Sequence, residues 1–413
     1  MKSVKLISAI LSVLLFFTVN SIAQQNNQVA KDFLQTNGGK LMLNNKEFRA
    51  IGFNKYDLLQ QILADYFPVE LKQWTEDKRT STGKNALKDL NKQGFKIIRV
   101  FGSPYWGHVL DELFFNKENR ENYLKANDDM LALAKKYNQK IVYTLIWHLD
   151  AFAIRKNETL KQLIADKSSA SRKDLNEYVT TIIKRYKDSP TIAMWEIANE
   201  GNLHADLKQK KEIGYTSQEL SEFYKDISKL IRDAGDKHHI ISSGDSQPRP
   251  EAWNLNDCII RSGDWNKPNW KADSFIQTKD ILKLVHTQDV TSVHFYGIPN
   301  PGNKSITDYF SMTQSIGQSD TAKPLFIGET GPRKTVEKLK LAGYNQLFSK
   351  EMTASLLKEI VANKVPLTLF WSYQIDNTAG SIQEWDIRKK GHKGSDDEII
   401  KMIQKANKEL QLP

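Results

Sequence analysis

The sequence predicts an α/β fold in which eight parallel strands close into a barrel within a single domain, the (β/α)8 or TIM barrel. Three observations favour this fold. Runs rich in β-branched and aromatic residues recur eight times, and amphipathic helical stretches separate them. The centres of these runs are nearly continuously apolar, as at residues 141–146, which is typical of parallel strands buried on both faces. Polar or aromatic residues end nearly every run, and a doubly wound sheet would not explain that placement.

Each predicted strand has an apolar centre and a polar or aromatic end. The strands cover residues 48–54, 96–102, 140–148, 191–200, 239–244, 291–296, 324–329 and 366–373. A short hairpin at residues 41–45 precedes the first strand, and we expect it to cover the floor of the barrel.

Helices are predicted where apolar side chains recur at helical spacing between the strands. The clearest examples are residues 120–137, 171–186 and 217–234. Ser171 with Asp174 three positions later is typical of a capping box, and Glu219 lies in the first turn after Ser217. These pairs predict that two of the helices start at Ser171 and Ser217.

The composition is that of a large globular protein, with 413 residues of which 40% are hydrophobic and 26% are charged. Length alone would allow two or three domains, but barrels with insertions reach this size as one unit. No linker or low-complexity segment interrupts the strand–helix units, so residues 24–413 are expected to form one domain.

The first residues have the features of a targeting segment. Lys2 and Lys5 precede an apolar run at residues 6–19, and Ser21-Ile22-Ala23 follows it. This order predicts a secretory signal peptide over residues 1–23. The alternative is a membrane anchor, but the run is shorter than the roughly 20 residues that span a bilayer. We therefore expect a secreted or periplasmic protein with no membrane span after cleavage.

Charge and cysteine content exclude other classes. The single cysteine, Cys258, cannot form an intrachain disulfide, and its apolar neighbours predict a buried side chain. The net charge of +10 is scattered, with the densest basic run at residues 388–393. Because no aromatic-basic motif accompanies this charge, we expect no nucleic-acid partner.

The polar strand ends form a candidate site, because the carboxyl ends of barrel strands meet on the face where such enzymes carry their active sites. These strand-end residues are Asn54, Arg99, His148, Asn199, Glu200, Asp245, His294, Tyr296, Glu329 and Trp371.

Two of these residues are glutamates that suit glycosidic cleavage. Glu200 and Glu329 end the fourth and seventh predicted strands, so they are expected to face each other across the barrel mouth. One carboxyl group can donate a proton while the other supplies negative charge; a gap of about 5–5.5 Å implies retention and roughly 6.5–9.5 Å implies inversion. Glu196, inside the fourth strand, is interpreted as a salt-bridged structural acid.

A metal site is the alternative interpretation, with His148, His294 and Glu329 as ligands. The sequence lacks a short His-x-x-x-His spacing, and Asn199 would have no role in such a site. We therefore expect neither a metal nor another cofactor.

The strand-end set, together with the Trp-Glu-Ile-Ala-Asn-Glu segment at residues 195–200, resembles the active-site signature of glycoside hydrolase family 5, within the clan A retaining glycosidases. The resemblance covers nearly the whole chain after residue 23. It implies that Glu200 is the catalytic acid/base and that Glu329 is the catalytic nucleophile. It also implies that Asn199 holds the sugar 2-hydroxyl.

The resemblance further implies that Arg99 and Tyr296 hydrogen-bond Glu329, that His294 lies near Glu200, that His148 lines the subsite of the cleaved sugar, and that Trp371 forms the platform beneath it. For Arg99 a structural salt bridge, and for the two histidines a polar cap, remain open alternatives.

The substrate is expected to be a plant-type β-1,4-linked polysaccharide or its oligosaccharides. Residues 41–54 and 186–200 most resemble endo-β-1,4-mannanases, although Gly201-Asn202 departs from the usual continuation. The alternatives are a β-1,4-glucanase, an exo-β-glycosidase of the same family, and a non-catalytic carbohydrate-binding barrel. Aromatic residues that could line a cleft, or pack in the core, are Trp106, Trp147, Trp253, Trp265 and Trp270, whereas Trp74 and Trp195 are expected in the core.

Overall fold

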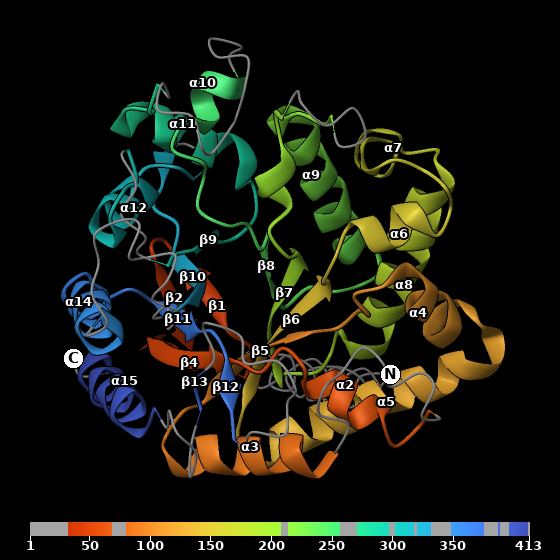
Figure 1. Ribbon diagram of the computed structural model, residues 1–413, viewed down its shortest axis with the longest axis horizontal. Coiled ribbons are helices and arrows are strands. Elements are labelled where there is room, and N and C mark those ends of the chain that lie inside the picture. The colour runs from red at the N-terminus through yellow and green to blue at the C-terminus, as the bar shows by residue number, and fades with distance from the viewer. Residues whose placement is uncertain are drawn as a thin grey trace, which may run out of the picture.

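The computed structural model describes residues 32–67, 80–207, 214–256, 271–296, 302–317, 320–331, 348–375, 387–388 and 396–411. Eight parallel strands form the central sheet, and helices surround it (Figure 1). Each strand falls within, or within one residue of, a predicted run. The strands are β4 (Ala50–Asn54), β5 (Ile97–Phe101), β6 (Lys140–Ile146), β7 (Ile192–Ala198), β8 (Ile240–Ser242), β9 (Thr291–His294), β10 (Leu325–Thr330) and β11 (Leu367–Phe370).

The sheet is nearly closed into a barrel. Its strand order is β8-β7-β6-β5-β4-β11-β10-β9. β11, the last barrel strand in the chain, pairs with β4, the first, with Leu367 opposite Ala50. The two edge strands, β8 and β9, meet through Asp289, whose backbone N–H donates to the carbonyl of Ile241 at 3.1 Å. The Asp289 carboxylate also accepts the Ile241 N–H at 2.8 Å. The predicted (β/α)8 fold is therefore confirmed.

Long helices cover the outside of the barrel, and short ones lie in its loops (Figure 1). The long ones are α3 (Thr80–Lys92), α5 (Lys117–Lys136), α8 (Ala170–Tyr186), α9 (Ser217–Asp233), α11 (Phe275–Val285), α12 (Ile306–Thr313), α14 (Phe348–Ala362) and α15 (Asp397–Leu410). The short ones are α2 (Leu58–Leu63), α4 (Gly107–Leu110), α6 (Asp150–Ile154), α7 (Leu160–Ala165) and α10 (Ala252–Asn256), with a π-helix at Asp111–Phe115 and a 3-10 helix at Gly201–His204. In the described ranges, no helix is both long and apolar enough to cross a membrane.

Of the two predicted helix starts, the one at Ser171 needs correction and the one at Ser217 is confirmed. Helix α8 is capped by Ser169, whose side chain accepts the N–H of Arg172, because Ser171 already lies inside the first turn. Asp174 instead forms an ion pair with Arg155. Helix α9 begins at Ser217, as predicted, and Thr216 and Glu219 form the capping box at its start.

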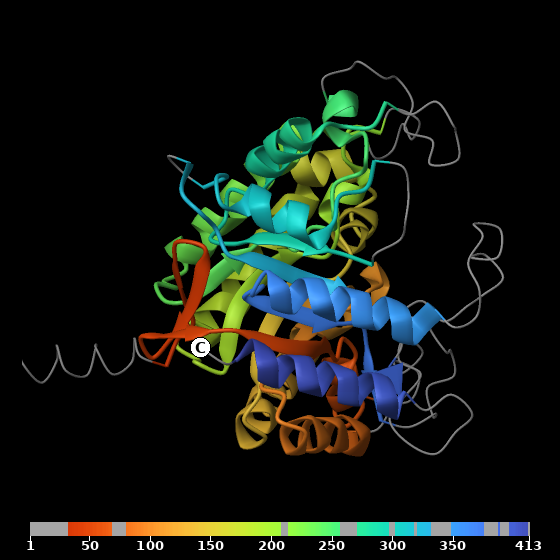
Figure 2. The same ribbon diagram turned by 90° about the vertical axis from the view of Figure 1, so that its left-hand side faces the viewer.

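A three-stranded antiparallel sheet covers the barrel floor, as predicted from the hairpin. It consists of β1 (Gln35–Asn37), β2 (Lys40–Leu43) and β3 (Lys46–Phe48), and Figure 2 shows it at one end of the molecule. Asn44 and Asn45 make its tight turn with positive φ. Leu41 is fully buried against side chains from the barrel strands, including Met194. Its apolar contacts close the floor.

Several predictions fall outside the described residues. They concern the signal peptide at residues 1–23, Cys258, Trp74, Trp265, Trp270 and most of the basic run at residues 388–393.

Candidate active site

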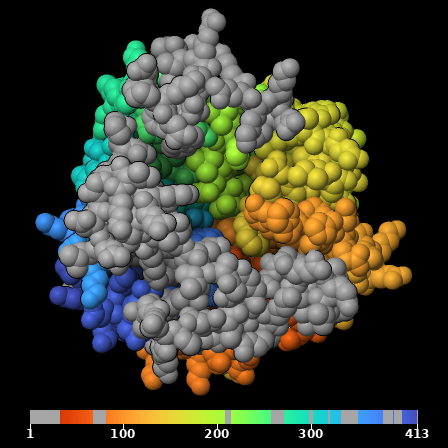
Figure 3. All heavy atoms as spheres, in the orientation of Figure 1, coloured from red at the N-terminus to blue at the C-terminus, as the bar shows by residue number. Residues whose placement is uncertain are grey.

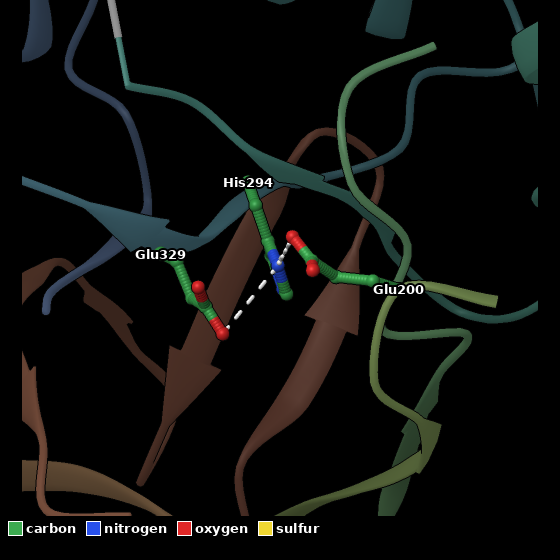
Figure 4. Close-up of side chains that lie close together, drawn as sticks. All are labelled: Glu200, His294 and Glu329. Atoms are coloured by element: carbon green, nitrogen blue, oxygen red, sulfur yellow. Dashed lines mark hydrogen bonds and ion pairs between the residues drawn. The ribbon is translucent and has the colours of Figure 1, made fainter. Parts of the chain in front are cut away.

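The predicted glutamates meet at the carboxyl ends of the strands. Glu200 follows β7 and Glu329 lies in β10, and in Figure 4 both side chains point toward His294 from β9. One carboxylate oxygen from each glutamate and one ring nitrogen of His294 lie within 4.8 Å of one another. This nearest-atom spacing is close to the carboxyl separation of retaining glycosidases, about 5–5.5 Å, and lies below the roughly 6.5–9.5 Å of inverting ones.

A tight turn places Glu200 on this face. Its backbone is left-handed, with φ 55° and ψ 34°, and its N–H donates to the carbonyl of Gly244 at 2.9 Å. A left-handed residue with a side chain costs about 1–2 kcal/mol. Such strain persists where the surrounding structure fixes the backbone, and it gathers at functional sites.

Glu329 is held by two donors. Arg99 donates through Nη1 to Oε1 at 2.6 Å, and the Tyr296 hydroxyl donates to Oε2 at 2.7 Å. Burial and the charge of Glu329 raise the pKa of Tyr296 well above its ordinary value, so this hydroxyl keeps its proton. Each carboxylate oxygen of Glu329 therefore has a fixed partner.

Arg99 connects four polar side chains inside the barrel. Besides Glu329, it donates to Glu196 at 2.7 Å, to Asn54 at 3.1 Å and to the Oδ1 atom of Asn199 at 2.8 Å. Burial lowers the pKa of Arg99, but the charges of Glu196 and Glu329 outweigh burial and raise it. Glu196 is thus the salt-bridged acid that its position inside the strand predicted.

His294 and Glu200 share a hydrogen bond. His294 Nδ1 lies 2.9 Å from Glu200 Oε1 and 3.5 Å from Glu329 Oε1. Burial lowers the pKa of His294, but the two glutamates outweigh it and raise that pKa. For Glu200, burial raises the pKa, but His294, Arg99 and the Ser246 hydroxyl together hold it below its ordinary value. Both pKa shifts favour a proton on His294 over a proton on Glu200.

A metal centre fits this cluster poorly. Within the described ranges, the candidate ligand group is Glu200, His294 and Glu329, and His148 is not part of it. Arg99 lies 2.6 Å from the same Glu329 oxygen that a cation would need. Two neighbouring positive charges in a buried site repel each other, and the arginine already occupies that place.

The similarity to known proteins decides the family. Residues 57–377 match the model of Cellulase (glycosyl hydrolase family 5). The chain belongs to glycoside hydrolase family 5. It is 24% identical over 352 residues to mannan endo-1,4-beta-mannosidase 2 of Oryza sativa subsp. japonica; the matched region covers 76% of this chain and 71% of that protein. It is 22% identical over 371 residues to mannan endo-1,4-beta-mannosidase 1 of Arabidopsis thaliana, covering 83% and 82%.

Solved structures agree on the fold of this family 5 hydrolase. The endo-1,4-beta-mannanase from Rhizomucor miehei superposes with a TM-score of 0.60 at 18% identity, covering 92% of this chain and 99% of that one. The endo-beta-1,4-mannanase from Thermotoga petrophila gives a TM-score of 0.61 at 18% identity, covering 89% and 78%. The chain is thus a glycoside hydrolase, as its strand-end residues predicted.

Aromatic side chains cluster at the carboxyl ends of β5, β6 and β11. Trp371 follows β11 and stacks on Tyr56, with ring centroids 4.8 Å apart and an interplanar angle of 10°. Phe101 stacks on Trp147 at 4.6 Å and also contacts Trp371. In the space-filling view, the orange and yellow surfaces after β5 and β6 border a recess near the centre of this face (Figure 3). Sequence reasoning found Trp371 and Trp147 but missed Tyr56, which stacks on the Trp371 ring.

His148 and the predicted tryptophans have different surroundings in the structure. His148 stacks on Tyr105 at 4.4 Å and lies 3.3 Å from the Asp150 carboxylate; burial lowers its pKa, more than Asp150 raises it. Among the tryptophans, Trp106 is 51% exposed, whereas Trp195 is fully buried as predicted.

Asp245 is also fully buried. It accepts from the Tyr224 hydroxyl at 2.5 Å and from the Asn202 N–H at 3.3 Å. Burial raises the pKa of Asp245 to about 7. Sequence reasoning placed it among the strand-end residues but gave it no role.

Proposed function

We propose that this chain is a retaining endo-β-1,4-mannanase that works by double displacement. The proximity of Glu200 and Glu329 carries the proposal, because carboxylate oxygens within 4.8 Å of each other suit the close carboxyl pair of a retaining enzyme better than the wider gap of an inverting one. Mannan as the substrate rests on the two plant relatives described above, both of which are named mannan endo-1,4-beta-mannosidases.

The chemistry divides between the two glutamates. Glu329 attacks the anomeric carbon as the glycosidic C–O bond breaks, and Glu200 gives its proton to the departing oxygen. Glu200 then removes a proton from water, whose oxygen attacks the anomeric carbon and releases Glu329. Arg99 and Tyr296 hold both oxygens of Glu329, so one lone pair stays aimed at the sugar.

His294 supplies the proton that Glu200 needs. In the free protein, the raised pKa of His294 and the lowered pKa of Glu200 favour the shared proton on His294, whose Nδ1 lies 2.9 Å from Glu200 Oε1. A bound sugar displaces water from Glu200, which is 28% exposed, and loss of solvent favours its neutral form. The proton then moves along the existing hydrogen bond, so the two groups titrate as a unit.

Two residues prepare the sugar position. Asn199 accepts from Arg99 through Oδ1, which leaves its amide nitrogen as the donor for the sugar 2-hydroxyl. Trp371, held by Tyr56, offers a flat apolar face to the C–H face of the ring.

The test is hydrolysis by the purified chain. We expect reducing sugar from mannan, galactomannan and glucomannan, less from cellulose, and oligosaccharides of mixed length. Glu329→Ala should lower kcat/KM by about 10³-fold or more, because it removes the nucleophile. Glu222→Gln, on the exposed face of α9, is the matched control and should be as active as the parent.

Two further measurements address the mechanism. Proton NMR should show that the first-formed product keeps the β-configuration, and Glu200→Ala with sodium azide should give a β-glycosyl azide. An initial α-product would refute retention. Preference for cellulose would instead favour a β-1,4-glucanase, release of single sugars an exo-β-glycosidase, and binding without hydrolysis a carbohydrate-binding barrel.

A further inference from the structure

Strand β10 contains one extra residue beside the candidate active site. Ile327 pairs with Val293 of β9. Glu329 lies two positions later, yet it pairs with the very next residue of β9, His294. The register with β11 shifts at the same place. An unequal count of this kind is a β-bulge, and Gly328 is the residue that has no counterpart in β9.

The bulge turns Glu329 toward the mouth of the barrel. Successive residues of a regular strand point to opposite faces, so Ile327 and Glu329 would share a face without the bulge. Ile327 packs in the core cluster that includes side chains of the surrounding helices. Glu329 instead lies beside His294, with Oε1 3.5 Å from the histidine Nδ1 (Figure 4). The extra residue therefore brings the nucleophile to the same face as the histidine.

Gly328 leaves the space that the His294 ring occupies. A Cβ atom at Gly328 would lie 2.9 Å from His294 Nε2 and 3.0 Å from Cδ2, closer than the 3.4 Å at which ordinary contact begins. The φ angle of Gly328 lies outside the left-handed region, so φ does not require glycine there. The requirement for glycine at this position is therefore one of space.

The His294 ring cannot easily move away from this position. Its side chain is fully buried, and Nδ1 is bonded to Glu200 Oε1 at 2.9 Å. On the side of Gly328, Nε2 is buried and makes no hydrogen bond within the described part of the chain. Packing, rather than a second hydrogen bond, thus sets where this end of the ring lies. Because the imidazole is rigid, a displacement at Nε2 also displaces Nδ1.

Other contacts hold the backbone of the bulge. The Asn54 side chain donates from Nδ2 to the Gly328 carbonyl at 2.9 Å, and the Phe295 N–H donates to the Glu329 carbonyl at 2.7 Å. The two donors described above hold the Glu329 carboxylate. These bonds do not use the side-chain position of Gly328. A methyl group there should therefore disturb the histidine ring more than the nucleophile.

We propose that Gly328 is a positioning residue for the acid/base, because its missing side chain lets the His294 ring lie within hydrogen-bonding distance of Glu200. The inference rests on the proposed acid/base role of Glu200. It gives the bulge of β10 two functions. The extra residue turns the nucleophile inward, and the choice of glycine admits the histidine beside it.

The test compares Gly328→Ala with the parent across pH on two substrates. Cleavage of a mannooligosaccharide needs a proton on a poor leaving group, whereas dinitrophenolate leaves a 2,4-dinitrophenyl β-mannoside without one. General acid–base catalysis contributes about 10²–10⁴-fold, so a misplaced histidine should lower kcat/KM by about 10-fold or more on the oligosaccharide and by less than about 3-fold on the aryl glycoside. The alkaline limb of the oligosaccharide profile should move to lower pH.

A double-mutant cycle separates contact with the ring from damage to the strand. His294→Ala removes the ring, so in that background Gly328→Ala should cost less than about 2-fold in kcat/KM if the methyl group acts through the histidine. Urea midpoints give the same comparison. Gly328→Ala should lower the midpoint of the parent but not that of His294→Ala, which decides the case even where the single variant is too unstable to assay.

The matched control is Gly39→Ala, in the turn between β1 and β2 on the barrel floor. Its φ is also outside the left-handed region and a Cβ there would meet Ala322 at an ordinary 3.4 Å, so neither substrate should change. Equal losses on both substrates, no loss at all, or an undiminished cost in the His294→Ala background would overturn the positioning role. If Glu329→Ala is as active as the parent, the proposed function itself fails. If the parent is active and only the Gly328 pattern is missing, the inference alone fails.

Discussion

Arg99 and Glu329 form an ion pair of 2.6 Å inside the barrel, with the arginine side chain fully buried and the glutamate side chain 7% exposed. The same guanidinium lies 2.6 Å from Glu196, which is fully buried. One cation thus neutralises two carboxylates, of which one is proposed to react and the other only holds the arginine in place.

Replacing Arg99 with Met should destabilise the protein strongly. The variant leaves Glu196 and Glu329 buried without their cation, and breaking a buried pair by removing one partner costs about 3–5 kcal/mol. Urea unfolding followed by circular dichroism measures the change. A loss below about 1 kcal/mol, as for a surface pair, would mean that the guanidinium does not carry this charge balance.

Tyr296→Phe should lower activity but keep the fold. It removes only the hydroxyl that donates to Glu329 Oε2 at 2.7 Å. Hydrogen bonds to charged groups contribute about 1.5–3 kcal/mol, which corresponds to a loss of roughly 10- to 100-fold in kcat/KM. Tyr309→Phe, which changes a buried tyrosine on α12, is the control; an equal loss in both variants would contradict the prediction.

The alkaline limb of the pH profile should depend on His294. Because the pKa of His294 is raised, the proton of the His294–Glu200 pair is present at lower pH and is lost as pH rises through that raised value. His294→Gln should move the alkaline limb of kcat/KM to lower pH, since Glu200 must then keep the proton alone. Initial rates on mannooligosaccharides between pH 4 and 9 test this, and an unmoved limb would exclude the shared proton.

Asp245→Asn should stabilise the protein at alkaline pH. A carboxyl group whose folded pKa is about 7 favours the folded state at low pH, and it costs stability progressively as pH rises from about 3.9 toward 7. The asparagine stays neutral, so the gain over the parent should grow by roughly 2–3 kcal/mol between pH 5 and 8. Urea midpoints at both pH values measure it; a gain independent of pH would mean that Asp245 does not titrate.

The features that the sequence predicted are those that leave a regular pattern. Buried parallel strands are apolar throughout and end abruptly, so the strand ends carrying Glu200, His294 and Glu329 could be located before the structure was known. Glu196 was separable from Glu200 because it lies inside β7 rather than at its end.

The missed features arise from contacts between irregular segments. Asn202 and Ser246 pair across 44 residues of sequence, and no periodicity marks loop residues that meet only after the barrel closes. Tyr56, which stacks on Trp371, was missed for the same reason. Ser171 and Thr216 show a further limit, because neighbouring hydroxyl residues compete for one helix start and backbone geometry selects between them.

The left-handed backbone at Glu200 opposes stability to activity, because the strain lowers the stability of the fold while the carboxylate is needed for catalysis. Glycine would hold this conformation with less strain than any residue that carries a side chain. Selection for thermal stability alone would therefore allow the carboxylate to be lost. Selection for polysaccharide hydrolysis keeps both the carboxylate and the strain. Substitutions intended to stabilise this protein should therefore be made outside that turn.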